Sequence, residues 1–313
     1  MQYRRLGDTG MQVSAVGLGG WINYGEGKVP DAEARRVVEH AYKQGITYFD
    51  LADIYGRGEA EQQMGAILAQ FPRHTLVIAS KLFWPMSDDV NDRGLSRKHI
   101  FASIERSLQR LGTDYLDLYF CHRPDPETPV EETARAMDDL IHQGKVLYWG
   151  TSEWSAEQII EAYDVCERYN LYKPKVEQPQ YSMLYREPVE SQVLPATAAR
   201  GIGLVVWSPL AMGMLTGKYD SGMPADSRFA REEWARARFL NDANAERVRL
   251  LKPVADELGI TRAQLALAWA LRHRTVSSVI IGATRTEQVD DNIGAVDVVL
   301  TDAALQAIER VIG

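Results

Sequence analysis

The sequence predicts an α/β protein in which eight parallel strands close into a (β/α)8 TIM barrel. Runs of β-forming residues alternate with helical patterns along nearly the whole chain, and eight such strand runs can be counted. Six of these runs end in a polar residue, which is typical of barrel strands at the active face. The 313 residues hold no long Pro-, Gly- or Ser-rich linker, so a single domain is expected over residues 1–313.

The elements follow in order along the chain. Residues 2–13 are predicted to form an extra hairpin before the barrel. A helix is predicted over 31–44, because apolar residues recur there at helical spacing and Gly45 follows the last of them. Gly112 is expected to stop another helix. The predicted strands are 14–20, 46–50, 75–81, 115–122, 146–152, 175–178, 203–208 and 277–285, and the other predicted helices are 59–70, 96–111, 130–143, 156–169 and 188–200. The irregular, charged stretch 216–243 follows the seventh strand, where a lid is expected.

The alternative architecture is an open, doubly wound sheet. Such sheets usually carry a GxGxxG fingerprint in the first strand-to-helix turn. The corresponding stretch here, "GLGGWINYGEGK", fits this fingerprint poorly because it has no glycine at the last position of the motif. The sequence therefore favours the barrel.

Composition excludes several classes of partner. With 35 Lys and Arg against 43 Asp and Glu, the net charge of -8 gives no basic field for nucleic acid or an acidic membrane, although a small anion remains possible. Cys121 and Cys166 lack CxxC spacing, which is typical of a reduced, cytosolic chain. No run approaches the ~18 apolar residues of a membrane span. A soluble cytoplasmic protein is expected.

The polar strand ends would converge on one mouth of the barrel, because active sites form at the C-terminal ends of barrel strands. Taken singly, each residue also has a structural explanation, such as a helix cap for an aspartate or a solvated lysine. The six are Asp50, Lys81, His122, Ser152, Gln178 and Ser208.

Four of the predicted groups form an acid–base set. Tyr55 follows the strand that ends in Asp50, and a phenol of pKa ~10 donates a proton near neutrality only beside a cation. Lys81 would be that cation, and Asp50 would keep it protonated. His122 would bind a substrate carbonyl oxygen. Trp21 and Trp84 each follow a strand at the active face and are expected to form apolar walls for the substrate.

Six motifs occur in an order that resembles the aldo-keto reductase superfamily: "FDLADIYG", "IASKLFW", "YFCHRPDPETPVEETARAM", "YWGTSEWS", "WSPLAMGMLTGKYDSGMP" and "SSVIIGATRTEQVDDNIGAV". The resemblance covers essentially the whole chain. It is strongest to the potassium-channel β-subunit-like reductases and related bacterial aldehyde reductases. It implies a TIM barrel, NADPH as cofactor, and Asp50, Tyr55, Lys81 and His122 as the catalytic tetrad.

The resemblance also implies the cofactor contacts. Ser152 and Gln178 would hold the nicotinamide carboxamide, and Trp207 would stack on the ring. Many members carry Asn where this chain has Glu153, so the role of Glu153 stays open. Histidine at 122, where channel subunits tend to carry Asn, favours a working reductase. The remaining predicted contacts are Gly20, Trp21, Asp50, Arg228, Gln288, Asp291 and Asn292.

The loops after the seventh and eighth strands suit phosphate, since barrels frequently bind phosphate there. The first of these loops offers Ser208, Pro209, Leu210, Gly213 and Lys218. The second offers Gly282, Thr284 and Arg285 at a helix start, and a guanidinium there suits the 2′-phosphate of NADPH, which favours NADPH over NADH.

The predicted function is NADPH-dependent reduction of an aldehyde, or less readily a ketone, with Tyr55 as the acid. The alternative is a redox-sensing subunit similar to the potassium-channel β-subunits, with slow turnover. A metal-dependent sugar isomerase is disfavoured because the strand ends offer only one Asp and one His, and no metal site is predicted. The carbonyl substrate stays open among sugar phosphates, methylglyoxal and aromatic aldehydes. A homo-oligomer, as in the related branch, stays open too.

Overall fold

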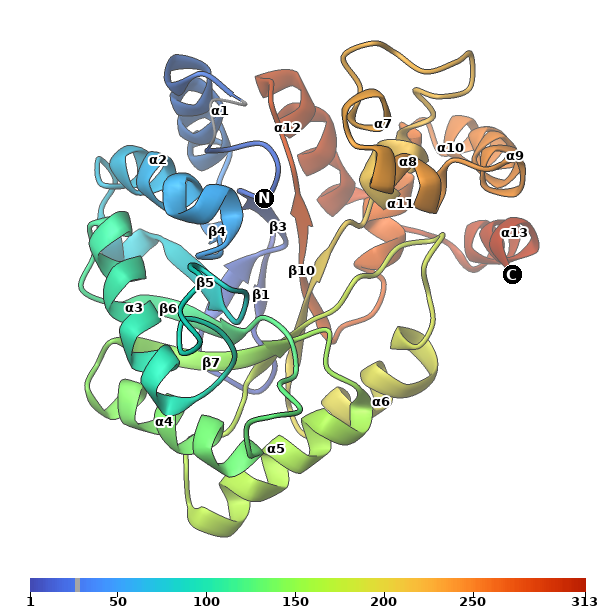
Figure 1. Cartoon of the computed structure of the whole chain (residues 1–313). Helices are drawn as coiled ribbons and strands as arrows, with labels where there is room; N and C mark the ends of the chain where they lie inside the picture. Colours follow the sequence, from blue (N-terminus) through green and yellow to red (C-terminus); the bar gives the residue numbers. More distant parts are fainter. Residues whose placement is uncertain (26–28) are drawn as a thin grey trace.

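The computed structural model describes residues 1–25 and 29–313. Eight parallel strands form a closed barrel in the order β10-β3-β4-β5-β6-β7-β8-β9, which confirms the predicted fold class. Helices surround these strands in Figure 1. The barrel strands are β3 (Val16–Gly19), β4 (Tyr48–Asp50), β5 (Val77–Leu82), β6 (Leu116–Cys121), β7 (Val146–Ser152), β8 (Val176–Gln178), β9 (Gly203–Trp207) and β10 (Val276–Ile281).

The helices of the first six crossovers lie close to their predicted bounds. They are α1 (Asp31–Lys43), α2 (Glu59–Leu68), α3 (Arg97–Leu111), α4 (Val130–His142), α5 (Ala156–Tyr169) and α6 (Leu194–Ala198), with short η1 (Tyr55–Gly58), η2 (Arg73–Thr75) and η3 (Val189–Val193) turns. The predicted helix 188–200 is the exception, because it divides into a π turn and a short α-helix. Pro195 stands in the first turn of α6, where its missing N–H is tolerated, whereas it would interrupt a continuous helix.

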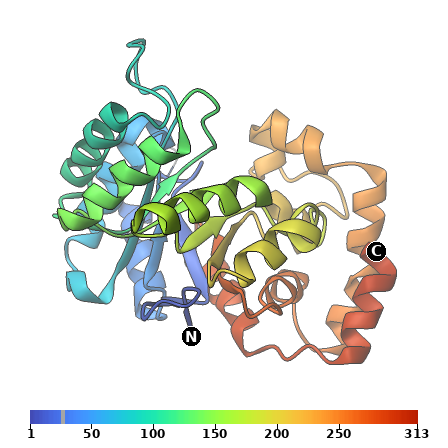
Figure 2. The ribbon, with the colours of Figure 1, turned by 90° about the horizontal axis from the view of Figure 1, so that it is seen from below.

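The crossover from β9 to β10 is the longest, and it contains helices where sequence patterns suggested an irregular stretch. Its elements are η4 (Ala211–Thr216), α7 (Arg228–Arg231), α8 (Glu233–Phe239), α9 (Asp242–Leu250), α10 (Lys252–Glu257) and α11 (Arg262–Ala270). After β10 come α12 (Thr286–Ile293), η5 (Gly294–Asp297) and α13 (Asp302–Ile312). Figure 2 shows the later helices gathered on one side of the molecule, where α13 packs against α9 and α10.

The predicted hairpin is present as β1 (Tyr3–Arg5) and β2 (Gln12–Ser14), which pair antiparallel. Leu6 and Val13 of this hairpin are fully buried in one cluster with side chains from inside the barrel, among them Val77 and Phe120. The hairpin therefore fills the end of the barrel opposite the C-terminal ends of the strands.

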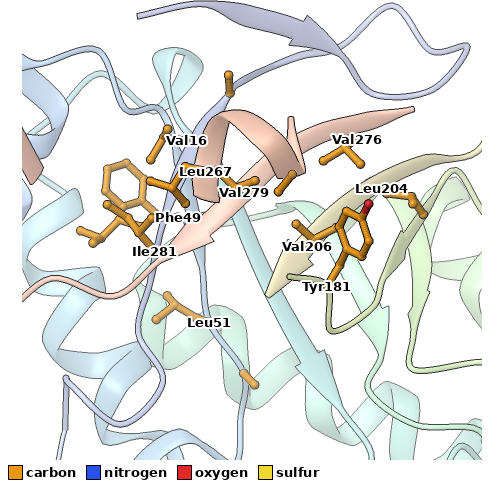
Figure 3. Close-up of a cluster of buried hydrophobic side chains, with 14 of the residues drawn as sticks. Val16, Phe49, Leu51, Tyr181, Leu204, Val206, Leu267, Val276, Val279 and Ile281 are labelled. Carbon is orange, nitrogen blue, oxygen red and sulfur yellow. The ribbon is translucent and has the colours of Figure 1, made fainter. Parts of the chain in front are cut away.

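A second apolar layer joins the barrel wall to the surrounding helices. Figure 3 shows Val16, Phe49 and Ile281 on neighbouring strands, with Leu267 of α11 beside them. Side chains alternate across a strand, so those that leave the barrel interior meet the apolar stripes of the helices. In the part of the chain that the structure describes, no helix is both long and apolar enough to cross a membrane.

Two carboxyl groups are buried at the barrel wall, which makes stability depend on pH. Burial raises the pKa of Asp53 to about 7 and the pKa of Glu177 to about 8. The folded protein therefore holds these protons more tightly than the unfolded chain does. Their contribution to stability is full below about pH 4 and is lost as the pH rises through 7 and 8.

The isosteric variants Asp53→Asn and Glu177→Gln remove this ionisation. Removal of the ionisation should recover about 1–2 kcal/mol at pH 8.5, so we expect each variant to raise the melting temperature there by about 1–3 °C relative to its effect at pH 5.5. Thermal unfolding at both pH values measures this difference. An equal effect at the two pH values would show that the native carboxyls do not titrate in this range.

Candidate active site

A cavity of about 880 Å³ opens at the C-terminal ends of the barrel strands. This volume is near the upper end for small-molecule sites and suits an extended ligand. Nearly all of the predicted site residues line it. These are Trp21, Asp50, Tyr55, Trp84, His122, Ser152, Gln178, Trp207, Ser208, Pro209, Leu210, Gly213, Lys218, Arg228, Gly282, Thr284, Arg285, Gln288, Asp291 and Asn292.

Lys81 lies directly behind the cavity wall and is fully buried. Its Nζ donates three hydrogen bonds, to Asp50 Oδ2 at 2.7 Å, to the Leu51 carbonyl at 2.8 Å and to Tyr55 Oη at 3.0 Å. An ammonium group has three donors, so each of them is used here. The lysine therefore joins the carboxylate to the phenol.

The carboxylate of Asp50 is fixed on its other oxygen as well. Oδ1 accepts hydrogen bonds from Gln178 Nε2 at 2.8 Å and from Tyr48 Oη at 3.1 Å. Gln178 stands beside Ser152 in the register of β7 and β8, and Ser152 Oγ donates to the Gln178 carbonyl at 2.9 Å. Gln178 thus holds Asp50 through an amide N–H while it lines the cavity.

The turn after β4 brings Tyr55 back over Lys81. Gly56, Arg57 and Gly58 all have left-handed backbone angles, with φ of 55°, 49° and 96°. A Cβ on Gly58 would lie 2.6 Å from the Arg110 side chain, so glycine is required there. This tight turn directly follows Tyr55 and leads into α2, and the phenol lies beside Lys81 of the next barrel strand, β5.

The charges of the buried pair support each other. Burial lowers the pKa of Lys81, but the charge of Asp50, the Tyr55 phenol and the hydrogen bonds to both of them together raise this pKa above its ordinary value. The lysine is therefore an ammonium at neutral pH.

Lys81 lowers the pKa of Tyr55, as the sequence predicted, but the net pKa of the phenol lies above its ordinary value. Burial raises the pKa of Tyr55, and Asp50 raises it further, while Lys81 offsets only part of this rise. Tyr55 therefore keeps its proton through neutral pH, as a proton donor must.

His122 is a neutral imidazole at the cavity wall. Burial lowers its pKa well below the ordinary value, and the charges of Lys81 and Arg123 lower it further. Its ring lies 5.9 Å from the Tyr55 ring, and its Nδ1 has no hydrogen-bond partner in the described part of the chain. Because Nδ1 is buried while the ring lines the cavity, a ligand oxygen would have to meet the imidazole at Nε2.

Trp21 and Trp84, the predicted aromatic walls, both line the cavity, and Trp84 lies 6.3 Å from the His122 ring between centroids. Trp21 lies 6.4 Å from Tyr55 and 5.6 Å from Trp207 between ring centroids. Trp234 of α8, which sequence reasoning missed, lies 5.4 Å from Trp21. The enlarged crossover thus reaches the mouth of the cavity, where the lid was expected.

Glu153 holds Trp207. Its Oε1 accepts hydrogen bonds from Trp207 Nε1 at 2.9 Å and from the Gln180 backbone N–H at 2.5 Å. Glu153 has a left-handed backbone with φ of 59°, which turns the chain after β7. The residue whose role the sequence left open therefore orients an indole that lines the cavity.

The far end of the cavity is cationic. Lys218, Arg228, Arg231 and Arg285 line it together with Asp226. Partial burial and then the charge of Arg228 lower the pKa of Lys218, and burial lowers the pKa of Arg228. Cations crowded in this way favour a polyanionic ligand such as a pyrophosphate or a phosphate monoester.

Two further observations fit a bound phosphate group at this end. A Cβ on Gly282 would lie 2.6 Å from Asn23 Nδ2 and 3.4 Å from an Arg228 nitrogen, so glycine allows these two nitrogen-bearing side chains to pack against the backbone at the cavity wall. Asn23 Nδ2 is buried without a hydrogen-bond partner among the described residues, although Asn23 Oδ1 accepts from Arg228 at 3.1 Å. An unused donor beside a guanidinium is suited to a phosphate oxygen.

Gly20 is the predicted contact that does not line the cavity. Its N–H donates to the Asp50 carbonyl at 2.8 Å, and a Cβ would lie 2.5 Å from Leu51, so its role is close packing of the first two barrel strands. Gly19 lines the cavity instead. Sequence reasoning missed Asn23 and Arg123, although Arg123 directly follows a strand-end residue, which was a usable signal.

Within residues 1–25 and 29–313, no group of three or more His, Cys, Asp and Glu side chains is placed to hold a metal ion. The chemistry of the donor set is that of an acid–base site beside an anion site.

Comparison with known proteins agrees with this geometry. The profile described as "Aldo/keto reductase family" matches residues 15–312. A protein named "Probable voltage-gated potassium channel subunit beta" from Arabidopsis thaliana is 47% identical over 319 residues, covering 100% of this chain and 97% of that protein. A protein of the same name from Oryza sativa subsp. japonica is 46% identical with the same coverage.

Proposed function

Since this chain belongs to the aldo/keto reductase family, we propose that it is an NADPH-dependent reductase that converts aldehydes, and less readily ketones, to alcohols. The observation that carries the proposal is the Asp50–Lys81–Tyr55 chain of hydrogen bonds, which ends at a protonated phenol on the cavity wall. A bound NADPH supplies the hydride. The chain's own residues supply the proton and the binding geometry.

The proton comes from Tyr55 Oη, which faces the cavity and holds its proton at neutral pH. As negative charge develops on the carbonyl oxygen, a phenolic O–H and a neutral imidazole, at Tyr55 and His122, are the donors that stabilise it. Lys81 then stabilises the tyrosinate that remains after proton transfer, because its Nζ already contacts Oη at 3.0 Å.

The residues around the cavity suit a dinucleotide. Ser152 Oγ and Gln178 Oε1 would bind the nicotinamide amide, Trp207 would cover the ring, and Lys218, Arg228 and Arg285 would bind the phosphates. Because the 2′-phosphate adds charge, we propose that NADPH is preferred over NADH.

Steady-state oxidation of NADPH with a panel of aldehydes tests the proposal, with NADH as the paired cofactor. We expect turnover with aldehydes and a lower KM for NADPH than for NADH, and the difference should shrink at high salt. Binding of NADPH without turnover on any aldehyde would contradict the proposed activity.

Glu153 is a positioning residue for the cofactor in this proposal. Glu153→Ala removes the acceptor of the Trp207 indole N–H, so we expect the Kd for NADPH to rise about tenfold, since hydrogen bonds to charged groups contribute ~1.5–3 kcal/mol. Fluorescence titration measures this Kd. Glu153→Gln keeps an acceptor oxygen and should bind NADPH nearly as the parent does. If Gln and Ala weakened binding equally, the charge of Glu153 and not its hydrogen bond would be responsible.

The names of the two plant relatives favour a second candidate function, that of an NADPH-binding, redox-sensing subunit of a potassium channel. Such a protein would turn over slowly and copurify with a membrane partner. The aldehyde assay, together with copurification from membranes, separates the two proposals.

A further inference from the structure

Arg123 is a cation on the wall of the cavity that the chemistry described so far does not use. It directly follows His122 and lines the cavity with Trp84 and Tyr55. Its guanidinium lies over the Trp84 ring, 5.6 Å from the centroid, and one of its N–H groups donates to the His122 carbonyl. Two neutral contacts therefore hold this side chain beside the phenol and the imidazole.

Arg123 makes no ion pair with any carboxylate of the described residues. The acid nearest in sequence, Asp125, accepts hydrogen bonds from the Leu95 and Glu127 backbone N–H groups and from Thr128 Oγ1. A half-buried guanidinium that lacks a counter-charge is suited to an anion, because it offers paired N–H donors in one plane.

The position of Arg123 distinguishes it from the cations that suit the cofactor phosphates. Lys218, Arg228 and Arg285 belong to the β9–β10 crossover and the segment after β10, whereas Arg123 follows β6, next to the groups that would bind the carbonyl oxygen. An anion bound by Arg123 would thus belong to the molecule whose carbonyl faces Tyr55 and His122.

We propose that Arg123 binds an anionic group of the carbonyl substrate, so that the preferred substrates are aldehydes that also carry a carboxylate or a phosphate. This assignment rests on the proposed reductase function and names its substrate class. Trp84 contributes by holding the guanidinium on its ring face, and neutral aldehydes of the same size lack the group that Arg123 binds.

The test compares a charged aldehyde with a neutral counterpart in each of two arms. In the carboxylate arm, 4-carboxybenzaldehyde is paired with methyl 4-formylbenzoate, and in the phosphate arm, glycolaldehyde phosphate is paired with glycolaldehyde. We expect kcat/KM of the parent protein to favour the charged member of at least one pair by about tenfold or more, the range of a charge-assisted hydrogen bond. The arm with the larger ratio identifies the anion.

Three variants locate the effect. Arg123→Met should bring the charged-to-neutral ratio close to one, and Arg123→Lys should restore part of it. Arg93→Met removes the same charge from an exposed site outside the cavity and should leave the ratio unchanged. Circular dichroism and NADPH titration of each variant confirm folding and cofactor binding.

Several outcomes would overturn the assignment. A parent ratio near one in both arms, or a ratio that Arg123→Met does not change, would show that Arg123 binds no substrate anion. If Arg123→Met lowered kcat/KM equally for both members of a pair, the charge of Arg123 would act on the reacting carbonyl oxygen and not on a substrate anion. A parent protein that reduces none of the four aldehydes would contradict the reductase function itself and the assignment with it.

Discussion

Tyr55→Phe is expected to lower kcat about 10²–10⁴-fold, the usual contribution of a general acid. The change removes one oxygen and keeps the ring that contacts Trp21 and His122. Lys81 keeps its contacts with Asp50 and the Leu51 carbonyl, so the site should stay assembled. The Kd for NADPH should change little, because the lost group faces the carbonyl oxygen.

Single-turnover reduction of an aldehyde, together with a fluorescence titration of NADPH, measures the two quantities separately. Tyr24→Phe is the matched control, because Tyr24 is a buried tyrosine outside the cavity whose Oη donates to the Ala283 carbonyl at 3.1 Å. This control should lose about 1 kcal/mol of stability and keep its turnover. If Tyr55→Phe reduced aldehydes at the rate of Tyr24→Phe, Tyr55 would not be the acid.

Lys81→Met is expected to lower both stability and activity. It leaves the Asp50 charge buried with hydrogen bonds from Tyr48 and Gln178 but without its counter-charge. Removal of one partner of a buried ion pair typically costs ~3–5 kcal/mol, and we expect a fall in the unfolding free energy of that order. Activity should fall as well, since no cation remains to stabilise the tyrosinate.

The double variant Lys81→Met/Asp50→Asn separates these two effects. With both charges removed, no uncompensated charge is buried, so unfolding by urea should show most of the lost stability recovered. Reduction of aldehydes should remain lost. A double variant as unstable as the single one would show that Lys81 stabilises the protein through packing and not through charge.

The sequence was most informative about the strand ends. Asp50, His122, Ser152 and Gln178 each close a run of β-formers, and parallel strands place such residues at one edge, so their convergence in the cavity follows from the strand pattern alone. The contact between Glu153 and Trp207 could not be predicted in this way. It depends on a left-handed residue after β7, and a loop course of that kind is not encoded by periodicity.

The acidity of Tyr55 could not be predicted either. The sequence identifies a cation that lowers the pKa of the phenol, but the net direction depends on burial and on the distance to Asp50. Arg123 was missed for a related reason. Its position directly after a strand end was a signal, but an arginine there is usually solvated, and the structure shows that it lines the cavity with no carboxylate partner among the described residues.

The hairpin formed by β1 and β2 has a kinetic consequence. Since Leu6 and Val13 fill one end of the barrel, reagents approach Asp50 and Gln178 from the opposite side. In the proposed function, the nicotinamide would lie against Ser152 and Gln178 at the strand ends, and a carbonyl substrate that enters through the same mouth would lie over it. Initial-velocity and product-inhibition patterns should accordingly be those of a compulsory-order mechanism, with the nucleotide as leading reactant.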